Sequence, residues 1–267
     1  MAARIVTITS GKGGVGKTTT TANLGVALAL SGKRVVTVDT DIGLRNLDVM
    51  LGLENRIVYD VVDVVEGRCR LHQALIRDKR LPQLHLLPAA QTRDKTAVNA
   101  DDLTAVCEQL RPDFDFVIID SPAGIEQGFQ TAVAPADLVL IITTPEVAAV
   151  RDADRVIGLA EANDKGPAQL IINRLKPGLV RRGDMLSTAD VVEILAIDLI
   201  GIVPEDEQII VAANRGKPVA FESNTQAGMA FRNIARRLNG EEVPFLDVDK
   251  PQGILGRIFG RVMSPNA

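Results

Sequence analysis

Apolar side chains along this chain gather in seven short runs, and longer stretches with helical spacing separate these runs. Within each run the apolar residues are nearly continuous instead of alternating with polar ones. That pattern is typical of strands that are buried on both faces of a parallel sheet. The predicted strands are residues 4–9, 34–39, 84–87, 116–120, 138–143, 168–173 and 199–204.

The stretches between the strands predict helices over residues 17–31, 101–110, 146–162, 188–195 and 227–238. Strands that alternate with helices in this way imply right-handed crossovers between parallel strands. The pattern therefore predicts an α/β fold with a doubly wound, mostly parallel sheet and helices on both faces. We expect one domain over residues 1–240, a linker over 241–250 and a tail over 251–267, because the composition changes only after residue 240.

Composition narrows the class of protein. The 267 residues are 46% apolar and carry a formal charge of -4, which supplies a large core and argues against a general nucleic-acid coat. Two cysteines and two histidines are too few for a disulfide framework or a four-thiolate zinc site. No apolar run reaches the ~18 residues of a membrane-spanning helix, and the chain runs directly into its first strand, unlike a signal peptide. We therefore expect a cytoplasmic protein.

A glycine-rich loop follows the first strand and precedes the first helix. It fits the pattern G-x-x-x-x-G-K-[ST] in the strand-loop-helix context that phosphate-binding loops require. Its glycines let backbone N–H groups point at phosphate oxygens, and the dipole of the next helix adds to this attraction. We expect Lys17 to pair with the β- and γ-phosphates and the Thr18 hydroxyl to ligate Mg²⁺ directly. The predicted nucleotide-binding residues are Gly11, Lys12, Gly13, Gly14, Val15, Gly16, Lys17, Thr18 and Thr19.

Carboxylates end two of the predicted strands. Asp120 ends the strand 116–120 in the manner of a Walker B carboxylate, which holds Mg²⁺ through water. Asp39 and Asp41 lie at the carboxyl end of the strand 34–39, where open α/β sheets bind ligands. From spacing alone, either one supports the metal while the other orients an attacking water, or both belong to an ordinary acidic turn.

A second lysine, Lys12, makes residues 11–18 read Gly-Lys-Gly-Gly-Val-Gly-Lys-Thr. This sequence resembles the deviant Walker A motif of the MinD/ParA family of P-loop ATPases. Residues 39–48 (Asp-Thr-Asp-Ile-Gly-Leu-Arg-Asn-Leu-Asp) and 120–125 (Asp-Ser-Pro-Ala-Gly-Ile) are similar to switch I and switch II of its MinD branch, which selects the bacterial division site. Residues 91–95, 145–152 and 182–185 also resemble MinD segments, so the likeness runs over nearly the whole chain.

The resemblance implies an ATPase that uses ATP and Mg²⁺ and forms a homodimer with ATP. It implies that Lys12 contacts the partner's nucleotide and that Asp41 positions the hydrolytic water, so Lys12, Lys17 and Asp41 are the predicted catalytic residues. It also implies that Asp39 and Asp120 hold Mg²⁺ through water. Other roles rest on the resemblance alone: Asn46 and Gly124 in the switches, Asn173, Pro204, Glu205 and Asp206 at the adenine base, and Arg151 and Asp152 on a partner surface. The implied partners are a MinC-like inhibitor and a MinE-like activator.

The C-terminal tail is basic and amphipathic. In a helical projection its apolar residues fall on one half of the circumference, opposite Arg257 and Arg261. A helix of this length, ~18 Å, lies in the plane of a membrane surface and does not cross it. MinD proteins carry a membrane-targeting helix here, so we expect a peripheral protein that binds anionic lipid on the cytoplasmic face of the inner membrane. The predicted membrane residues are Ile254, Leu255, Arg257, Ile258, Phe259, Arg261 and Val262.

These features predict an ATPase that recruits a division inhibitor to the membrane and is released by hydrolysis. The alternative is a ParA-type DNA-partitioning ATPase, which the acidic net charge and the lipid-type tail disfavour. We expect no specific nucleic-acid ligand, and we interpret the basic loop 174–182 as solvated. A metabolic ligase or reductase would need a second substrate site, for which the sequence offers no candidate. Cys69 and Cys107 either share an iron–sulfur cluster across a dimer or, as the apolar pattern around Cys107 favours, act as ordinary thiols.

Overall fold

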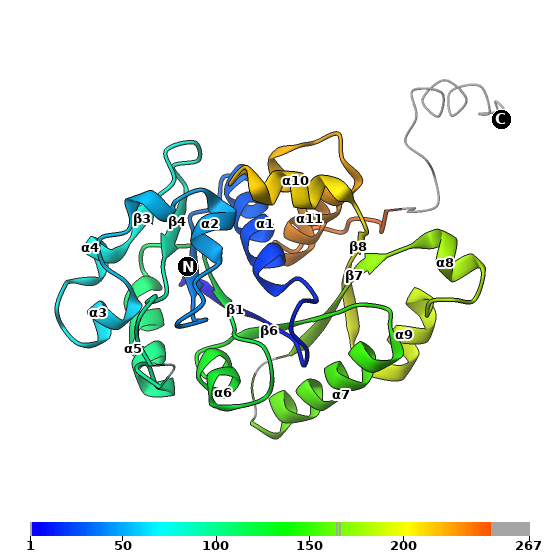
Figure 1. Cartoon of the computed structure of the whole chain (residues 1–267), viewed down its shortest axis with the longest axis horizontal. Helices are drawn as coiled ribbons and strands as arrows, with labels where there is room; N and C mark the ends of the chain where they lie inside the picture. Colours follow the sequence, from blue (N-terminus) through cyan, green and yellow to red (C-terminus); the bar gives the residue numbers. More distant parts are fainter. Residues whose placement is uncertain (1, 95, 164, 166, 247–267) are drawn as a thin grey trace.

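The computed structural model describes residues 2–94, 96–163, 165 and 167–246. Within them, eight strands form one sheet in the order β3-β4-β2-β5-β1-β6-β7-β8 (Figure 1). Neighbouring strands are parallel, except that β3 and β4 are antiparallel. The strands are β1 (Arg4–Thr9), β2 (Val35–Asp39), β3 (Ile76–Arg77), β4 (Leu84–Leu87), β5 (Phe116–Asp120), β6 (Leu138–Thr143), β7 (Ala168–Leu175) and β8 (Asp198–Pro204).

Helices connect the strands and cover both faces of the sheet (Figure 1). They are α1 (Lys17–Leu30), α2 (Leu47–Leu51), α3 (Val61–Val65), α4 (Leu71–Ala74), α5 (Ala100–Leu110), α6 (Gln127–Val133), α7 (Val147–Ala162), α8 (Pro177–Arg181), α9 (Thr188–Leu195), α10 (Glu207–Asn214) and α11 (Gln226–Leu238), with the 3-10 turns η1 (Glu54–Arg56) and η2 (Val219–Phe221).

Alternate residues of each strand pack on opposite faces of the sheet, as the pleat requires. Val6 and Ile8 of β1 belong to a core cluster that contains the buried residues of α1 and α11. Ile5 of β1 packs in a second cluster with residues of α5, and Val139 of β6 packs in a third with residues of α7 and α9. The predicted doubly wound α/β fold is therefore confirmed.

The predicted strands and helices are present, with bounds that differ by no more than two residues; the largest change is in β7, which continues to Leu175. The structure adds elements that the sequence pattern did not predict. Helices α2, α3, α4 and α8 have five residues or fewer, too few to establish a helical period. In helix α10, Ile209 and Ala212 pack partly buried against the core while Ile210 and Val211 are exposed, so its short apolar run does not define one clear stripe.

The first part of the predicted linker lies against α11. Arg237 donates hydrogen bonds to the carbonyl oxygens of Val243 and Pro244 at 2.9 and 2.8 Å. Its guanidinium carbon also lies 4.2 Å from the centre of the Phe245 ring, which is a favourable cation–π distance. Residues 241–246 are thus held to the domain, and the predicted boundaries of linker and tail stay predictions, since residues 247–267 lie outside the described part of the chain.

Candidate nucleotide-binding site

The phosphate loop lies between the end of β1 and the start of α1 (Figure 1). Gly14 and Gly16 have left-handed backbone angles, with φ of 78° and 104°, which glycine adopts without strain. The carbonyl oxygen of Gly16 accepts a hydrogen bond from the Thr20 N–H at 2.9 Å and so begins α1. The same residue therefore turns the loop and starts the helix whose N-terminus faces it, the arrangement that binds phosphate.

Two glycines let this loop touch neighbouring elements closely. A Cβ atom on Gly11 would lie 2.2 Å from the carbonyl oxygen of Asp152 in α7. A Cβ atom on Gly16 would lie 2.3 Å from Nδ2 of Asn173 in β7. Neither space admits a side chain, so packing requires glycine at both positions, and the loop is anchored to two elements that follow it far along the chain.

Lys17 lies under the loop with only 8% of its surface exposed. Its ammonium Nζ donates to Ser10 Oγ at 3.2 Å, and the Ser10 hydroxyl donates to the Lys12 carbonyl oxygen at 2.8 Å. Burial lowers the pKa of Lys17, and the carboxylates of Asp120 and Asp41 oppose that shift. These two carboxylates keep the ammonium group charged in a dry site, where it is suited to pair with phosphate oxygens.

Asp39 and Asp120 stand opposite each other in register at the ends of β2 and β5. Each is 1% exposed. Burial raises the pKa of Asp120 to about 7, although hydrogen bonds from Thr18 and Thr21 and the charge of Lys17 oppose the shift. Burial raises the pKa of Asp39 well above its usual range, and the charge of Asp120 adds to this effect. Two buried carboxyls side by side resist joint ionisation, and a bound cation would relieve that penalty.

The oxygens at this place suit Mg²⁺, which prefers carboxylate, hydroxyl and water ligands. Asp39 already accepts hydrogen bonds from the backbone N–H groups of Asp41 and Leu47 at 2.9 and 3.3 Å. Asp120 Oδ1 accepts from Thr21 Oγ1 at 3.1 Å. Carboxylates that are held in this way by the protein fit the predicted role of gripping magnesium through water, while Thr18 at the start of α1 is the predicted direct ligand.

Asp41 follows β2 and is half-buried. Its charge acts on the pKa values of both Lys17 and Asp120, so its carboxylate lies close to the phosphate loop. Asp41 also lines a hollow of about 190 Å³, whose other walls are Thr40, Ile42, Thr96 and residues 122, 123 and 126–129. This hollow reaches from the predicted switch II segment to Asp41, and the role of Asp41 in positioning water stays a prediction.

The two predicted switch residues are not among the residues that line this hollow. Asn46 is exposed, and it precedes α2 without capping it through its side chain. Gly124 has a φ of 99°, and a Cβ atom there would meet nothing within 4 Å. Glycine at position 124 is thus required by the backbone angle and not by packing.

The predicted adenine residues come from the ends of β7 and β8. Asn173 is 3% exposed, and its Nδ2 donates to the Val15 carbonyl oxygen at 2.8 Å. Pro204 lies in register with Leu175 of β7, and the Glu205 N–H donates to the Leu175 carbonyl oxygen at 3.0 Å. The structure therefore brings the two predicted base segments together beside the phosphate loop.

Asp206 has a structural role that the sequence pattern did not reveal. Its carboxylate accepts the Gln208 N–H at 2.9 Å, which caps the start of α10. Its other oxygen accepts the Ala227 N–H from the start of α11 at 3.3 Å. The contact of Asp206 with a base stays a prediction.

The predicted surface residues lie around the mouth of the site. Lys12 and Arg151 are exposed, and Asp152 is half-buried against Gly11. The predicted partner surface on α7 is consequently in direct contact with the phosphate loop.

Sequence reasoning missed two hydroxyls of the site. Thr21 Oγ1 donates to Asp120 Oδ1 and lies 3.1 Å from the Lys17 carbonyl oxygen. Thr40 Oγ1 donates to the Asp120 carbonyl oxygen at 2.6 Å. Thr21 lies four residues after Lys17 on α1, so both lie on one helix face, and this spacing could have predicted that Thr21 belongs to the site. Thr40 lies in a loop, where no spacing rule predicts its position.

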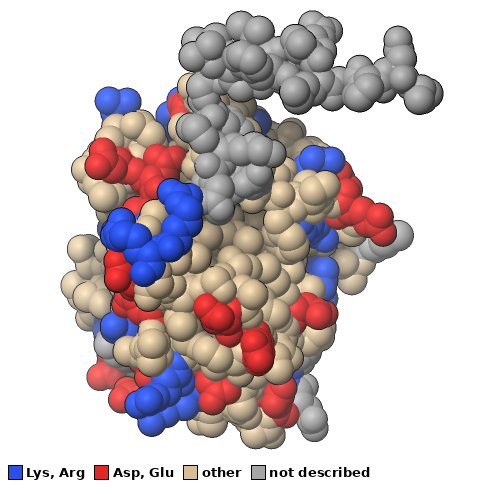
Figure 2. Space-filling view, turned by 90° about the vertical axis from the view of Figure 1, so that its right-hand side faces the viewer, with Lys and Arg blue, Asp and Glu red and all other residues tan. Residues whose placement is uncertain are grey.

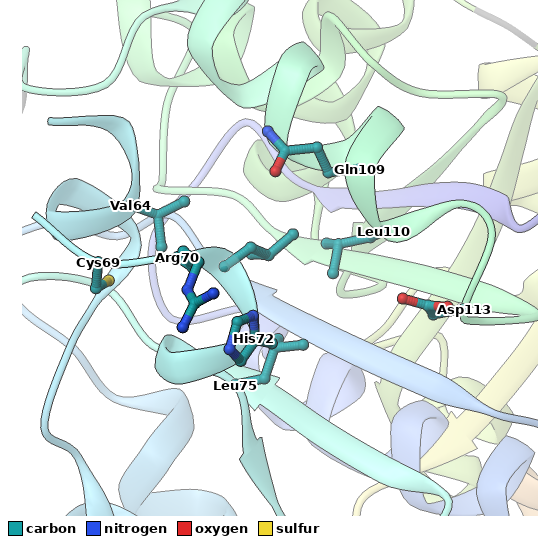
Figure 3. A pocket seen from close by; sticks show the side chains of 9 residues that line it. Val64, Cys69, Arg70, His72, Leu75, Gln109, Leu110 and Asp113 are labelled. Atoms are coloured by element: carbon teal, nitrogen blue, oxygen red, sulfur yellow. The ribbon is translucent and has the colours of Figure 1, made fainter. Parts of the chain in front are cut away.

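The two cysteines occupy different surroundings. Cys107 is fully buried in α5, and burial raises the pKa of its thiol to about 12, which confirms the interpretation as an ordinary buried thiol. Cys69 lines a separate hollow of about 470 Å³ between α4 and α5 (Figure 3). Burial also raises the pKa of Cys69.

Basic and acidic side chains are interspersed on the face at the β8 edge of the sheet (Figure 2). The basic segment 174–182 is not a loop as predicted, because it contains the end of β7 and helix α8. Arg182 pairs with Asp184 at 2.9 Å and Arg174 lies 4.0 Å from Glu205. These acids offset part of its positive charge, and the interpretation as a solvated segment stays a prediction.

The predicted membrane residues, from position 254 to position 262, lie outside the described part of the chain. In the part that the structure describes, no helix combines the length and the apolar character that crossing a bilayer requires.

Comparison with known proteins adds to this geometry. Residues 6–219 match the family described as the CobQ/CobB/MinD/ParA nucleotide binding domain. The septum site-determining protein MinD of Synechocystis is 58% identical over 262 residues, which cover 97% of this chain and 98% of that protein. The MinC:MinD cell division protein complex of Aquifex aeolicus contains a chain that is 50% identical, with a TM-score of 0.85 over 91% of this chain and 98% of that one. The MinD of Pyrococcus horikoshii, solved with Mg-ADP, is 28% identical, with a TM-score of 0.80 over 89% and 96%.

Proposed function

This chain belongs to the MinD septum site-determining ATPases of the CobQ/CobB/MinD/ParA family, and we propose that it selects the division site by an ATP-driven membrane cycle. In this cycle it dimerises with Mg–ATP and binds the cytoplasmic face of the inner membrane through its tail. There it recruits a MinC-like inhibitor of division. Hydrolysis, stimulated by a MinE-like activator, returns it to the cytoplasm.

One observation carries this proposal: a buried lysine, Lys17, and a buried pair of carboxyls, Asp39 and Asp120, meet under a phosphate loop whose second lysine, Lys12, is exposed. The buried groups are suited to hold a nucleotide with magnesium. The exposed lysine is suited to reach a second copy of the chain. A site that is shared between two copies would couple ATP binding to dimerisation.

The residues of the chain perform hydrolysis mainly by positioning and by neutralising charge. Lys17 and the backbone N–H groups of the loop bind the phosphates, and Asp41 orients a water and accepts its proton as the water attacks the γ-phosphorus. Magnesium, when bound, neutralises charge on the β- and γ-phosphates. The bond from the γ-phosphorus to the bridging oxygen breaks, so the products are ADP and inorganic phosphate.

In this proposal the tail is the element through which dimerisation controls membrane binding. Six apolar side chains at ~1.5 kcal/mol each offer about 9 kcal/mol on burial, and the cost of ordering the tail opposes most of it. The six side chains are Ile254, Leu255, Ile258, Phe259, Val262 and Met263. A single tail therefore binds weakly, whereas two tails in one dimer act together and bind much more strongly. The proposed division into a domain (1–240), a linker (241–250) and a membrane tail (251–267) follows from this role.

A vesicle sedimentation assay tests the cycle. The parent should pellet with anionic vesicles in ATP and stay in the supernatant in ADP or without nucleotide. Ile258→Glu should stay in the supernatant even in ATP, because it places a carboxylate among the apolar residues of the tail. Ser264→Glu is the matched control, since position 264 falls on the side of Arg257 in the helical projection and should pellet like the parent.

The same assay separates the alternatives. Equal pelleting of the parent and Ile258→Glu would show that the tail is not the anchor. Binding of the parent to DNA-cellulose at physiological salt, without lipid, would favour a DNA-partitioning role. For the partner, MinC of the Aquifex type is the probe, because that relative was solved as a MinC:MinD complex; capture of MinC should require ATP and should fail for Asp152→Ala.

A further inference from the structure

Helices α2 and α10 meet end to end at two glycines. Gly52, which ends α2, has a φ of 65°, and Gly216, which follows α10, has a φ of 58°. A Cβ atom on Gly52 would lie 2.6 Å from the Gly216 carbonyl oxygen, and one on Gly216 would lie 2.6 Å from the Gly52 Cα. The backbones of the two segments are therefore in direct contact, which glycine alone permits at this distance.

An arginine from a third element holds this junction. Arg80, in the loop between β3 and β4, donates to the Gly216 carbonyl oxygen at 2.8 Å and to the Leu51 carbonyl oxygen. Leu51 is the last residue of α2, and the last carbonyls of a helix have no partner within it. One guanidinium thus bonds the last carbonyl of α2, where a positive charge is also favourable, and the carbonyl of Gly216, which lies two residues after the end of α10.

Arg80 is itself fixed in place. Its guanidinium donates to both carboxylate oxygens of Asp78, at 3.1 and 2.8 Å, and Asp78 is 1% exposed. The guanidinium also lies 5.4 Å from the centre of the Phe221 ring in η2. A bidentate pair of this kind has a fixed geometry, so Arg80 acts as a rigid clamp between α2 and α10.

The opposite ends of these helices lie at the two ends of the nucleotide site. Helix α2 begins within the switch I segment (residues 39–48), and the Leu47 N–H donates to Asp39 Oδ2 at 3.3 Å. Helix α10 begins directly after residues 204–206, the predicted base segment, and Asp206 caps it. The Arg80 clamp therefore links α2, which bonds the predicted magnesium carboxylate Asp39, to α10, which follows the predicted base segment.

We propose that Arg80 is a positioning residue that couples the phosphate end of the site to the base end by locking α2 against α10. A ligand in the phosphate loop then reduces local opening of the base segment. A bound base likewise reduces local opening of switch I, since such coupling is reciprocal. This inference rests on the nucleotide site of the proposed function, and it assigns no contact between Arg80 and the nucleotide.

Hydrogen exchange with a ligand that reaches only the phosphate end tests the clamp. The probe is tripolyphosphate with Mg²⁺, which lacks a base. In the parent it should slow amide exchange in α2 and also in α10, each by at least ~5-fold. In Arg80→Lys, which keeps a charge for Asp78 but lacks the fork, α2 should still respond while the response of α10 falls below ~2-fold. Arg77→Met is the matched control, because the Arg77 guanidinium bonds Pro82 within its own loop.

The possible results are distinct. If Arg80 has a merely structural role, Arg80→Lys would raise amide exchange in both α2 and α10, with and without the probe. The ratio of the α10 response to the α2 response would then equal that of the parent, which would overturn the proposal. A parent in which α2 responds and α10 does not would overturn it as well. A parent in which neither helix responds would overturn the phosphate site, and the coupling with it. Gly216→Ala, which forces the helices apart, should reproduce the Arg80→Lys result.

Discussion

Asn173 Nδ2 donates a hydrogen bond to the carbonyl oxygen of Val15 at 2.8 Å, across 158 residues of sequence. The bond joins the end of β7 to the middle of the phosphate loop, and the Asn173 amide occupies the space that a side chain on Gly16 would need. One residue therefore supports the loop in its curled form, and it is also a residue that is predicted to contact the base.

Replacement of this amide should weaken nucleotide binding. In Asn173→Ala the Val15 carbonyl loses a buried hydrogen bond, which costs about 1–1.5 kcal/mol. The affinity for Mg–ADP should fall roughly 5- to 12-fold, as measured by calorimetry. Asn163→Ala is the control, because the Asn163 side chain bonds the Leu159 carbonyl near the end of α7; equal affinities of the two variants would remove the role of Asn173.

The two loop lysines should separate binding from assembly. Lys17→Ala should abolish ATP binding, because the buried ammonium that faces the phosphates is lost. Lys12→Ala should bind ATP as a monomer but neither dimerise nor hydrolyse, since Lys12 is exposed and points away from the core of its own chain. Calorimetry measures the first effect and light scattering with ATP the second. Affinity of Lys17→Ala within about threefold of the parent, roughly 0.6 kcal/mol, or normal dimerisation of Lys12→Ala, would contradict these assignments.

Binding of Mg–ADP should release a proton at mildly acidic pH. The pKa of Asp120 is about 7 in the nucleotide-free protein, and the groups that face it are Asp39, Asp41 and Lys17. At about pH 6 the buried pair holds a proton that a magnesium ion must displace. Calorimetry in buffers of different ionisation enthalpy should show more proton release at about pH 6 than at about pH 8.5. Asp120→Asn should reduce the release, while Asp39, whose pKa is also raised, remains.

The same pKa has a consequence for stability. An aspartate in the unfolded chain has its ordinary pKa of 3.8, so between about pH 4 and 7 the folded protein holds a proton that the unfolded chain has lost. The contribution of this group to the free energy of unfolding is therefore fully present below pH 4 and falls as the pH rises toward 7. Urea unfolding of the nucleotide-free protein across this range should show a smaller decline for Asp120→Asn than for the parent.

The sequence predicted those parts of the molecule that depend on local pattern. Continuous apolar runs identify buried strands such as β5, and the glycine spacing from Gly11 to Lys17 identifies the phosphate loop. Asp39 and Asp120 were predictable because parallel strands bring their carboxyl ends to one edge of a sheet. Their placement in register required only the fold class.

The parts that the sequence did not predict depend on contacts between distant segments. The bond from Asn173 to Val15 and the clamp of Arg80 on Leu51 and Gly216 join residues 29 to 158 positions apart. Such contacts leave no periodic signal, because they are set by how loops pack and not by the elements themselves. Helix α10 escaped prediction for a different reason, since its apolar residues lie both on the packed side (Ile209, Ala212) and on the exposed side (Ile210, Val211).

Removal of the Asp41 carboxylate should separate binding from turnover. In Asp41→Ala the phosphate loop and Lys17 keep their contacts, so Mg–ATP should bind with nearly the parental affinity and the protein should dimerise. Hydrolysis should slow by 10²- to 10⁴-fold, the usual range for a group that activates an attacking water, and the protein should remain on vesicles in ATP. Asp48→Ala is a poor control, because the Asp48 carboxylate is buried and pairs with Arg45 at 2.9 Å. Glu54→Ala is the better one, since Glu54 lies half-buried in the turn η1 after α2 and accepts a hydrogen bond from its neighbour Asn55. Turnover of Asp41→Ala equal to that of Glu54→Ala would make Asp41 an ordinary acid of the turn after β2.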